Sequence, residues 1–307
     1  MTAFELVDNH AWAAATPRLS VLIPFCRDDP TRLLAAIDQA GAPAELVILD
    51  DGSGDPALAE RVANAVRGMT MPARFVRLAE NEGRAVGRNR LAAQARGLHF
   101  LFLDSDMLPD IADFLGRWLE LAERENPAVA FGGFSVDQAP RTRENAVHRA
   151  LSLRSDCVPA DVRQLQPEKY VFTSNLLIRR DVFESEPFDV GFVGWGWEDV
   201  EWGMRVSRRH AIQHIDNPAT HLGLAPAGAM AAKYEQSAAN FARVVAAHGD
   251  IVRHYPSYRA ARALRRLPLR PLWRPWLKAA ALIDVAPSGM RAFALRLYRA
   301  ALYAEAV

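Results

Sequence analysis

The chain has 307 residues and a formal net charge of +1, and half of its residues are hydrophobic. This length and composition supply enough apolar side chains for a packed core, so extensive disorder is excluded. The charge is unevenly distributed along the chain. The segment after residue 252 has eleven arginines and lysines but only two acids, Asp284 and Glu305, which leaves a net charge of about −8 on residues 1–252. A body this acidic is a poor partner for nucleic acid, whose affinity depends on phosphate contacts, and it suits divalent cations better.

The low cysteine content and the lack of a recognisable targeting signal predict a cytoplasmic protein. Cys26 and Cys157 are too few for a disulfide framework. Residues 1–17 lack the basic start and apolar run of a signal peptide, and no apolar stretch approaches the roughly 18 residues that span a bilayer. We expect a cytoplasmic protein whose contact with the inner face of the cell membrane, if it has one, is peripheral.

Strand-like and helix-like patterns alternate in the first half of the chain. Buried strands are predicted at 19–25, 45–51, 73–78 and 98–104. Helices are predicted at 56–68, with Asp55 as the N-cap and Pro56 at the first position, and at 83–97 and 110–125. This alternation is typical of an α/β fold with a mostly parallel sheet flanked by helices.

The second half is less regular. Strands are expected at 128–136 and 170–180, with a last strand and a turn in 211–223, and residues 139–169 lack periodicity and are interpreted as a long loop or lid. Helices are expected at 181–184, 198–210 and 229–248. A stretch rich in proline and arginine at 267–276 then separates them from a final amphipathic segment.

The segment "LDSDM" follows the fourth predicted strand and holds two carboxylates. Asp104 and Asp106 are two residues apart, so in extended chain both side chains point to one side. Hard oxygen ligands of this kind suit magnesium or manganese. An acidic turn after a strand is the plainer alternative.

Two further segments follow strands at the same expected edge of the sheet. "ILDDGSGDP" places Asp50 and Asp51 after the second strand, where a parallel sheet binds ligands. "NEGRAVGRN" places Arg84 and Arg88 near a helix start, a favourable position for an anion. An ordinary turn and a solvated basic face are the alternatives.

"GWGWED" sets indole rings against two acids. Trp195 and Trp197 are suited to pack on the face of a sugar while Asp199 or Glu198 takes a hydroxyl proton. Helix capping by the acids and core packing of the indoles are the alternatives, and we expect core packing for Trp202. Further along the chain, His221 could complete a metal site formed by the paired aspartates.

Taken together and in this order, these segments resemble inverting glycosyltransferases of the GT-A fold, family two, from about residue 19 to residue 223. Residues 173–206 are similar to the acceptor half that animal β-1,4-galactosyltransferases share with bacterial polysaccharide synthases. The resemblance implies a Rossmann-like sheet and a catalytic domain at 1–228. Within it, 19–110 would bind the nucleotide sugar and 111–228 the acceptor, and 229–307 would be a helical, basic C-terminal extension.

The resemblance also implies roles for single residues. Asp199 would be the catalytic base, and a divalent Mn²⁺ or Mg²⁺ would be held by Asp104, Asp106 and His221. The donor and its nucleotide would contact Pro24, Phe25, Arg27, Asp50, Asp51, Arg88, Asp104 and Ser105, and the acceptor side would be formed by Trp195, Trp197 and Glu198. Trp197 departs from the family, because a glycine is frequent at its position.

The expected function is transfer of a sugar, with inversion, from a nucleotide sugar, UDP-linked in our interpretation, to a saccharide or lipid-linked saccharide of the bacterial surface. The alternatives are a retaining N-acetylgalactosaminyltransferase-like enzyme, a sugar nucleotidyltransferase and a non-catalytic binding module. The basic tail suits either an anionic lipid surface or packing on the catalytic domain or a partner. Formation of a homo-oligomer is left open.

Overall fold

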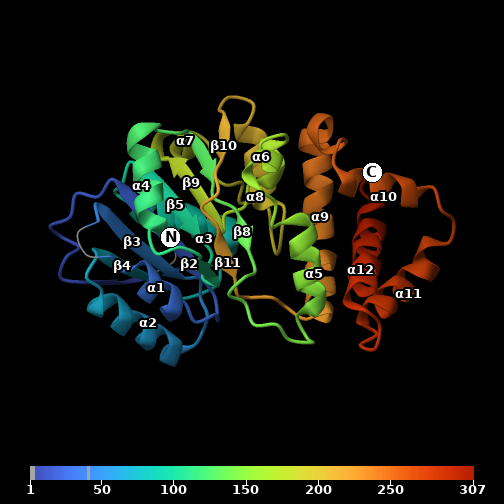
Figure 1. The fold of residues 1–307 in the computed structure, drawn as a ribbon, viewed down its shortest axis with the longest axis horizontal. Helices are drawn as coiled ribbons and strands as arrows, with labels where there is room; N and C mark the ends of the chain where they lie inside the picture. Colours follow the sequence, from blue (N-terminus) through green and yellow to red (C-terminus); the bar gives the residue numbers. More distant parts are fainter. Residues whose placement is uncertain (1–3, 40–41) are drawn as a thin grey trace.

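The computed structural model describes residues 4–39 and 42–307, and a large mixed sheet occupies one end of the molecule (Figure 1). The sheet has the strand order β1-β4-β3-β2-β5-β9-β7-β10. Strands β4, β3, β2 and β5 run parallel to one another, and β1 and β9 pair antiparallel with β4 and β5 at the two ends of this group. Its strands are β1 (Phe4–Asp8), β2 (Leu19–Phe25), β3 (Ala44–Asp50), β4 (Ala73–Leu78), β5 (His99–Leu103), β7 (Val129–Phe131), β9 (Asn175–Arg179) and β10 (Ile212–His214).

Helices cover both faces of this sheet, so the strand side chains that point to either face are buried, as expected for a parallel sheet. One core combines Val21, Ile23 and their equivalents with helices α1, α2 and α4. The other combines Leu22 and its equivalents with α3, α7 and α8. These helices are α1 (Thr31–Ile37), α2 (Pro56–Gly68), α3 (Arg84–Gln94), α4 (Phe114–Arg124), α7 (Arg180–Ser185) and α8 (Glu198–Val206).

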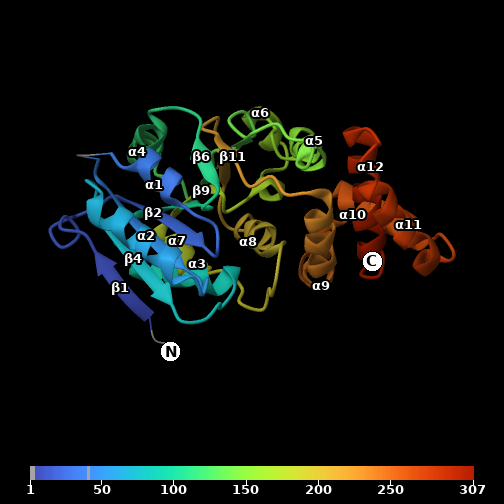
Figure 2. The ribbon, with the colours of Figure 1, turned by 90° about the horizontal axis from the view of Figure 1, so that it is seen from below.

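A small sheet and a group of C-terminal helices complete the fold (Figure 2). The small sheet has the order β6-β11-β8 and consists of β6 (Met107–Pro109), β8 (Phe134–Ser135) and β11 (Ala219–His221). The remaining helices are α5 (Ala146–Ser155), α6 (Ala160–Arg163), the 3₁₀ turn η1 (Pro167–Tyr170), α9 (Ala227–Val252), α10 (Pro256–Arg265), α11 (Arg270–Leu282) and α12 (Ser288–Tyr303). Among the described helices, none has a stretch that is long and apolar enough to cross a bilayer.

The predicted α/β class, with a mostly parallel sheet and C-terminal helices, is confirmed. The strands at 19–25 and 73–78 and the helix at 56–68 have the predicted bounds. Asp55 caps that helix as expected, accepting hydrogen bonds from the backbone N–H groups of Ala57 and Leu58 at 2.9 and 3.0 Å. The proposed division of the chain at residue 228 stays a prediction, and α9 begins at Ala227.

Four local predictions were wrong. Residues 139–169 are not an irregular loop but contain α5, α6 and η1, because Val147 and Leu151 of α5 pack against the C-terminal helices that sequence periodicity did not connect to them. Residues 211–223 form two strands, β10 and β11, which join different sheets. The strand expected at 128–136 is likewise divided into β7 and β8, which join different sheets. The stretch rich in proline and arginine does not separate helices throughout, since α11 begins inside it at residue 270.

The turn after β3 depends on a close approach of two backbone segments. Gly52 has φ +62°, and a Cβ there would lie 2.2 Å from the carbonyl carbon of Glu80. Gly54 has φ +69°, but a Cβ there would meet no atom within 4 Å. Glycine at position 52 therefore lets residues 80–83 lie against the end of β3.

We predict that Gly52→Ala destabilises the protein more than Gly54→Ala. The left-handed backbone alone costs an alanine about 1–2 kcal/mol, whereas position 52 adds a clash that typically costs roughly 1–3 kcal/mol more. Urea unfolding of the two variants measures the difference. Equal losses of unfolding free energy would show that the close approach is not maintained in solution.

Candidate active site

The site is built where parallel strands end at the same edge of the sheet. Phe25 of β2 is in register with Asp50 of β3, and β5 runs parallel to β2 on its other side. The segments that follow these strands carry Arg27, Asp51 and the Asp104–Asp106 pair. Asp104, Ser105 and Asp106 are each half-buried. The topology thus brings the predicted ligand-binding segments together at one edge.

The predicted nucleoside contacts fall into two groups. Phe25 lies in the core, 3% exposed and stacked on Phe75 with ring centroids 6.2 Å apart. The Asp50 carboxylate is buried and accepts hydrogen bonds from the N–H and the hydroxyl of Ser53, so it holds the turn. Pro24 is half-buried, and Arg27 is exposed with φ +70°. Of these, only Pro24 and Arg27 present side chains beyond the core.

Asp51 anchors the loop that starts α3. Its carboxylate accepts hydrogen bonds from the backbone N–H groups of Glu82 at 2.8 Å and Gly83 at 3.1 Å, and from the Asn81 amide at 3.1 Å. Burial raises the pKa of Asp51 although these hydrogen bonds oppose the shift. Asp51 therefore fixes the position at which α3 begins, and with it the arginines of that helix.

Two arginines of α3 join the acidic segment after β5 to the acidic start of α8. Arg88 is 1% exposed and donates to Asp104 Oδ1 at 2.8 Å and to Glu198 Oε1 at 3.2 Å. Arg84 donates to the same Glu198 oxygen at 2.6 Å, and its guanidinium lies 3.8 Å from Asp104. Residues from three distant parts of the sequence are thereby held in one ion-pair network.

The two carboxylates at the start of α8 have different electrostatic surroundings. Burial alone would raise the pKa of Glu198, but the charges of Arg84 and Arg88 outweigh it and hold that pKa below its usual range. Burial and the negative charge of Glu198 raise the pKa of Asp199 to about 7. Asp199 is half-buried, whereas Glu198 is 3% exposed. Their surroundings thus keep Glu198 charged at neutral pH and bring the pKa of Asp199 close to neutral pH.

Asp106 and His221 form the second polar group of the site. His221 Nε2 lies 3.1 Å from Asp106 Oδ2. Burial favours the neutral forms of both side chains, but their interaction with each other outweighs burial. The pKa of Asp106 is therefore lowered and the pKa of His221 is raised. Gly223 makes room for this carboxylate, because a Cβ there would lie 2.0 Å from Asp106 Oδ2.

His148 of α5 supports His221 from a segment that was expected to be a loop. Their ring centroids are 5.4 Å apart. His148 Nδ1 accepts a hydrogen bond from the Ala225 N–H at 2.8 Å, and burial together with the charge of His221 lowers the pKa of His148 to about 3. His148 is therefore neutral near pH 7.

The three indoles of "GWGWEDVEW" have different environments. Trp197 donates its N–H to the Tyr303 hydroxyl at 2.9 Å and packs on Phe241, so its ring belongs to the contact with the C-terminal helices. Trp195 is half-buried beside Tyr234. Trp202 is fully buried in the sheet core, as predicted.

The backbone before α8 adopts a conformation at position 197 that favours glycine. Trp197 has φ +77°, in the left-handed region that glycine adopts without strain. Asn240 of α9 donates hydrogen bonds to the carbonyls of Val193 and Gly196, which hold this loop on α9. The loop's contacts with α9 and α12 stabilise the strained residue, and Glu198 and Asp199 follow at the first turn of α8.

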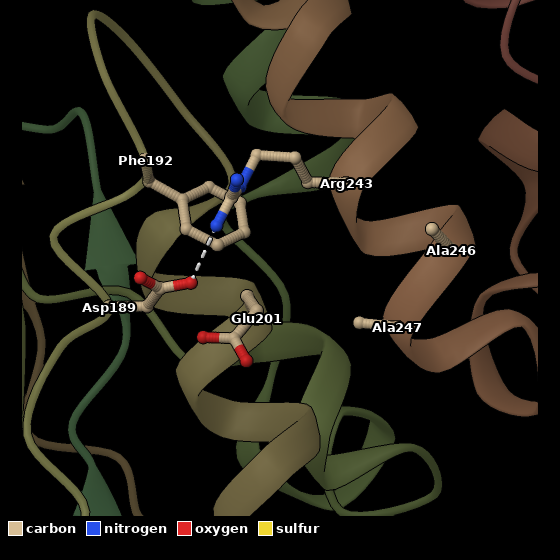
Figure 3. Close-up of a pocket in the computed structure, with 6 residues that line it drawn as sticks. All are labelled: Asp189, Phe192, Glu201, Arg243, Ala246 and Ala247. Atoms are coloured by element: carbon tan, nitrogen blue, oxygen red, sulfur yellow. Dashed lines mark hydrogen bonds and ion pairs between the residues drawn. The ribbon is translucent and has the colours of Figure 1, made fainter.

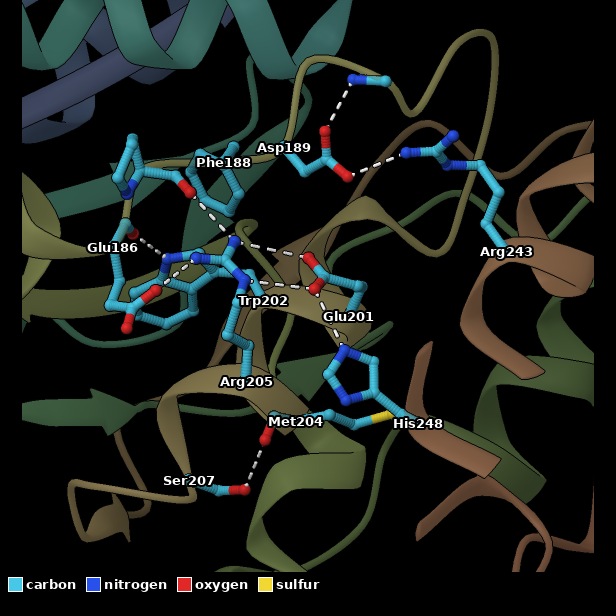
Figure 4. Close-up of polar contacts among 12 residues, drawn as sticks. Glu186, Phe188, Asp189, Glu201, Trp202, Met204, Arg205, Ser207, Arg243 and His248 are labelled. Atoms are coloured by element: carbon cyan, nitrogen blue, oxygen red, sulfur yellow. Dashed lines mark hydrogen bonds and ion pairs between the residues drawn. The ribbon is translucent and has the colours of Figure 1, made fainter. Parts of the chain in front are cut away.

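A hollow of about 340 Å³ lies between the loop that precedes α8, α8 itself and α9 (Figure 3). Asp189 and Arg243 form an ion pair at 2.9 Å, and Glu201 also lines this hollow. Glu201 bonds to Arg205 and His248, and Arg205 bonds to Glu186 (Figure 4). Because these polar groups pair with one another, we assign them to holding α8 against α9.

Sequence reasoning missed Lys233 of α9. Its ammonium lies 5.7 Å from the centre of the Trp195 ring. Its positive charge favours lower pKa values for Asp28, Asp106 and His221. No ion pair is formed by Lys233 within residues 4–39 and 42–307. The residue lies in no recognisable motif, so only the packing of α9 brings it to the site.

Two side chains of the site could supply donor atoms to a cation, although they do not form a complete metal site. Over the described part of the chain, no three His, Cys, Asp or Glu side chains are arranged to hold a metal ion. Asp106 and His221 supply one oxygen and one nitrogen donor side by side, while Asp104 faces Arg88. A pair of ligands that leaves open positions suits a cation whose remaining ligands are substrate phosphates.

Sequence comparison relates this chain to known proteins. Residues 20–186 match the family described as Glycosyl transferase family 2. A Bacillus subtilis (strain 168) protein, named uncharacterized glycosyltransferase YfnE, is 24% identical over 208 residues, and the match covers 53% of this chain and 52% of that protein. The chain therefore matches about half of this relative's length.

Solved structures share the fold. A mannosyltransferase from Pyrobaculum calidifontis, in complex with GDP-Man and Mn²⁺, has a TM-score of 0.57 at 15% identity, covering 96% of this chain and 88% of its own. S. aureus TarS 1–349 has a TM-score of 0.54 at 16% identity, covering 94% and 90%. Its complex with UDP-GlcNAc has a TM-score of 0.52 at 17% identity, again covering 94% and 90%. At these identities the likeness shows a common GT-A fold.

Proposed function

The chain belongs to glycosyl transferase family 2. We propose that it is a glycosyltransferase that uses a nucleotide sugar and transfers the sugar to a hydroxyl group with inversion, using Asp199 as the base. The observation that carries this proposal is the network in which Arg84 and Arg88 tie Glu198 to Asp104. It holds the acidic start of α8 beside the strand end that would receive the donor. The matched family region ends at residue 186, so the role of α8 is our inference.

Asp199 suits the role of base better than its neighbour. A general base works best when its pKa lies near the operating pH, and the pKa of Asp199 is raised to about 7 by burial and by Glu198. Glu198 is tied to two arginines. Asp199 would accept the proton of the acceptor hydroxyl as its oxygen attacks the anomeric carbon from the side opposite the nucleotide. The bond to the diphosphate breaks in the same step.

A UDP-sugar is the proposed donor. TarS, with the same fold, is described in complex with UDP-GlcNAc and with UDP, and the mannosyltransferase with GDP-Man, so the fold accepts either kind of nucleotide. Pro24 and Arg27 would contact the nucleoside, with Asp51 shaping the pocket through its loop. Phe25 and Asp50 would act through the backbone and the turn, because their side chains are buried.

A divalent cation, Mn²⁺ or Mg²⁺, would bind Asp106 and His221, which lie side by side, and Asp104 would exchange its ion pair with Arg88 for a ligand bond. Bound there, the cation would neutralise the charge of the departing diphosphate. Arg84, Arg88 and Lys233 add positive charge around the same position. Asp104 and Ser105 would face the donor.

The acceptor side is proposed to lie next to Trp195. Its half-buried indole provides an apolar face on which a sugar ring can pack. Trp197 is less suited, since its N–H and ring are engaged by Tyr303 and Phe241. We propose a saccharide or lipid-linked saccharide acceptor, an acceptor half of the galactosyltransferase type and a role in bacterial surface polysaccharide or glycolipid synthesis.

The base assignment predicts that Asp199→Asn lowers the rate of transfer by about 10²- to 10⁴-fold, the usual contribution of a general base, without weakening donor binding. Transfer kinetics and calorimetric titration with UDP measure the two effects. Asp181→Asn, which removes an exposed carboxylate at the start of α7, is the matched control and should keep its rate. Near wild-type turnover of Asp199→Asn would refute the assignment. A product of retained anomeric configuration, seen by NMR, would refute inversion.

The pKa of Asp199 predicts the pH dependence. The base must be deprotonated, so kcat/KM should fall as pH drops through about 7. Glu198→Gln removes the neighbouring negative charge, which lowers the pKa of Asp199 and moves this acid limb to lower pH. The rate of this variant also falls, because the arginines lose a charged partner. The exposed Glu184→Gln is the control. An acid limb that does not move in Glu198→Gln would contradict this origin of the pKa.

The contact between Gly223 and Asp106 predicts a metal effect. The added Cβ of Gly223→Ala displaces the Asp106 carboxylate, so the Mn²⁺ concentration for half-maximal activity should rise by at least about tenfold, as when the partners of a metal ligand are disturbed. Calorimetric titration with Mn²⁺ in the presence of UDP provides a second readout. Gly68→Ala, where a Cβ meets no atom within 4 Å, should leave both unchanged. An unchanged Mn²⁺ requirement in Gly223→Ala would argue against Asp106 as a ligand.

A further inference from the structure

Exposed apolar side chains are concentrated in the C-terminal helices. Sixteen large hydrophobic side chains are exposed in the described residues, and nine of them lie between residues 267 and 293. Scattered exposed apolar residues are ordinary, whereas a concentration in one segment marks an interaction surface. The nine are Leu267, Leu269, Leu272, Trp276, Leu282, Ile283, Val285, Met290 and Phe293.

Helix α11 is bound to the protein through one face. Leu277 and Ala281 pack in the core formed with α9 and α12. Lys278 donates to Glu235 of α9 at 2.7 Å, and Arg274 donates to Glu305 at 2.7 Å. These inward residues recur at three- and four-residue spacing, so they define one side of the helix.

The opposite face of α11 is apolar as well. Leu272 and Trp276 are 64% and 76% exposed, and the exposed Ala279 and Ile283 continue the same stripe at three- and four-residue spacing. A surface helix normally presents polar side chains to water on this side. The stripe therefore has no partner within the described chain.

The turn to α12 extends this surface. Arg291 is buried and bonds to the carbonyl of Ala281 at 3.0 Å and to Asp284 at 2.8 Å, so it ties the two helices together. Met290 and Phe293, 67% and 60% exposed, lie three residues apart on α12. We call residues 262–293 the C-terminal surface. Figure 1 shows it at the end of the molecule away from the large sheet.

Positive charge accompanies the apolar stripe. Arg262, Arg265 and Arg266 are exposed in and just after α10, and none of them forms an ion pair with any residue that the structure describes. The whole segment after residue 252 has eleven basic residues against two acidic ones. Leucine, tryptophan and unpaired arginine in this arrangement match the chemistry of an interfacial helix on anionic lipid.

We propose that the C-terminal surface docks on an anionic phospholipid bilayer, with the stripe of α11 inserted at the headgroup level and the arginines of α10 on the lipid phosphates. The positive charge selects negatively charged lipid, and tryptophan favours the interface between water and hydrocarbon. The docking is peripheral. It stands independently of the proposed reaction.

Helix α9 connects the C-terminal surface to the candidate active site. Glu235 accepts from Lys278 of α11 and from Tyr298 of α12, at 2.7 and 2.6 Å. Lys233, two residues earlier on α9, acts on Asp106 in the site. Helix α11, on which the bilayer would dock, is therefore bonded directly to the helix that contributes Lys233 to the site, which suits an acceptor delivered from a membrane.

The test is flotation of the full chain with vesicles of phosphatidylcholine alone or mixed with phosphatidylglycerol. Wild type should float with the anionic vesicles only, and less at high salt. Leu272→Ser/Trp276→Ser should bind at least about tenfold more weakly, since one buried apolar side chain contributes about that factor or more. Arg262→Gln/Arg265→Gln/Arg266→Gln should also bind at least about tenfold more weakly, since a single basic residue near the surface is worth roughly fivefold. Leu165→Ser removes an 80% exposed leucine elsewhere and is the matched control.

Circular dichroism and light scattering complete the design. Every variant should keep the wild-type spectrum, because the changed side chains are exposed. The proposal is overturned if wild type does not float with anionic vesicles, or if the double variant and Leu165→Ser bind equally well. It is also overturned if wild type is an oligomer that Leu272→Ser/Trp276→Ser converts to monomers while vesicle binding is absent, because the surface would then dock a second copy.

Discussion

The candidate site depends on one buried cation. Arg88 is 1% exposed, and its guanidinium bonds both to Asp104, after β5, and to Glu198, at the start of α8. A buried charge is tolerated only when its partners are held in place, so this network constrains three elements at once. Arg84 adds a second link to the same carboxylate. The donor side and the acceptor side of the proposed reaction are joined through these arginines.

The same network separates the roles of two neighbouring acids. Glu198 is paired and stays charged, and its charge together with burial brings the pKa of Asp199 to about 7. Environment, rather than residue type, keeps one carboxylate charged and brings the pKa of the other close to neutral pH, as the proposed base requires. At the other end of the site, Asp106 and His221 pair with each other beside a glycine that leaves room for them.

The C-terminal helices complete the site rather than merely follow it. Asn240 and Tyr303 hold the loop and the indole that precede α8, and Lys233 brings a positive charge toward Asp106. These contacts cross from α9 and α12 to the segment that carries Asp199. Their outer face, with its exposed leucines, tryptophan and arginines, is available for the bilayer proposed above.

The sequence by itself determined the elements whose signals are local. The strands at 19–25 and 73–78 and the capped helix at 56–68 could be predicted to the residue, because the apolar runs, Asp55 and Pro56 act within one element. It also identified the segments that end at one edge of a parallel sheet, since that follows from topology. Asp50 and Phe25 were recognised as part of this region, but their burial and pairing were not.

Only the tertiary structure decided what depends on packing between distant segments. Helix α5 forms because its apolar face meets the C-terminal helices, and Trp197 turns away from the site because Tyr303, more than a hundred residues later, binds its indole. The contribution of Lys233 and the separation of the pKa values of Glu198 and Asp199 likewise arise from charges brought together by folding. Residue order carries no direct record of such distances, because burial and Coulomb interactions act through space.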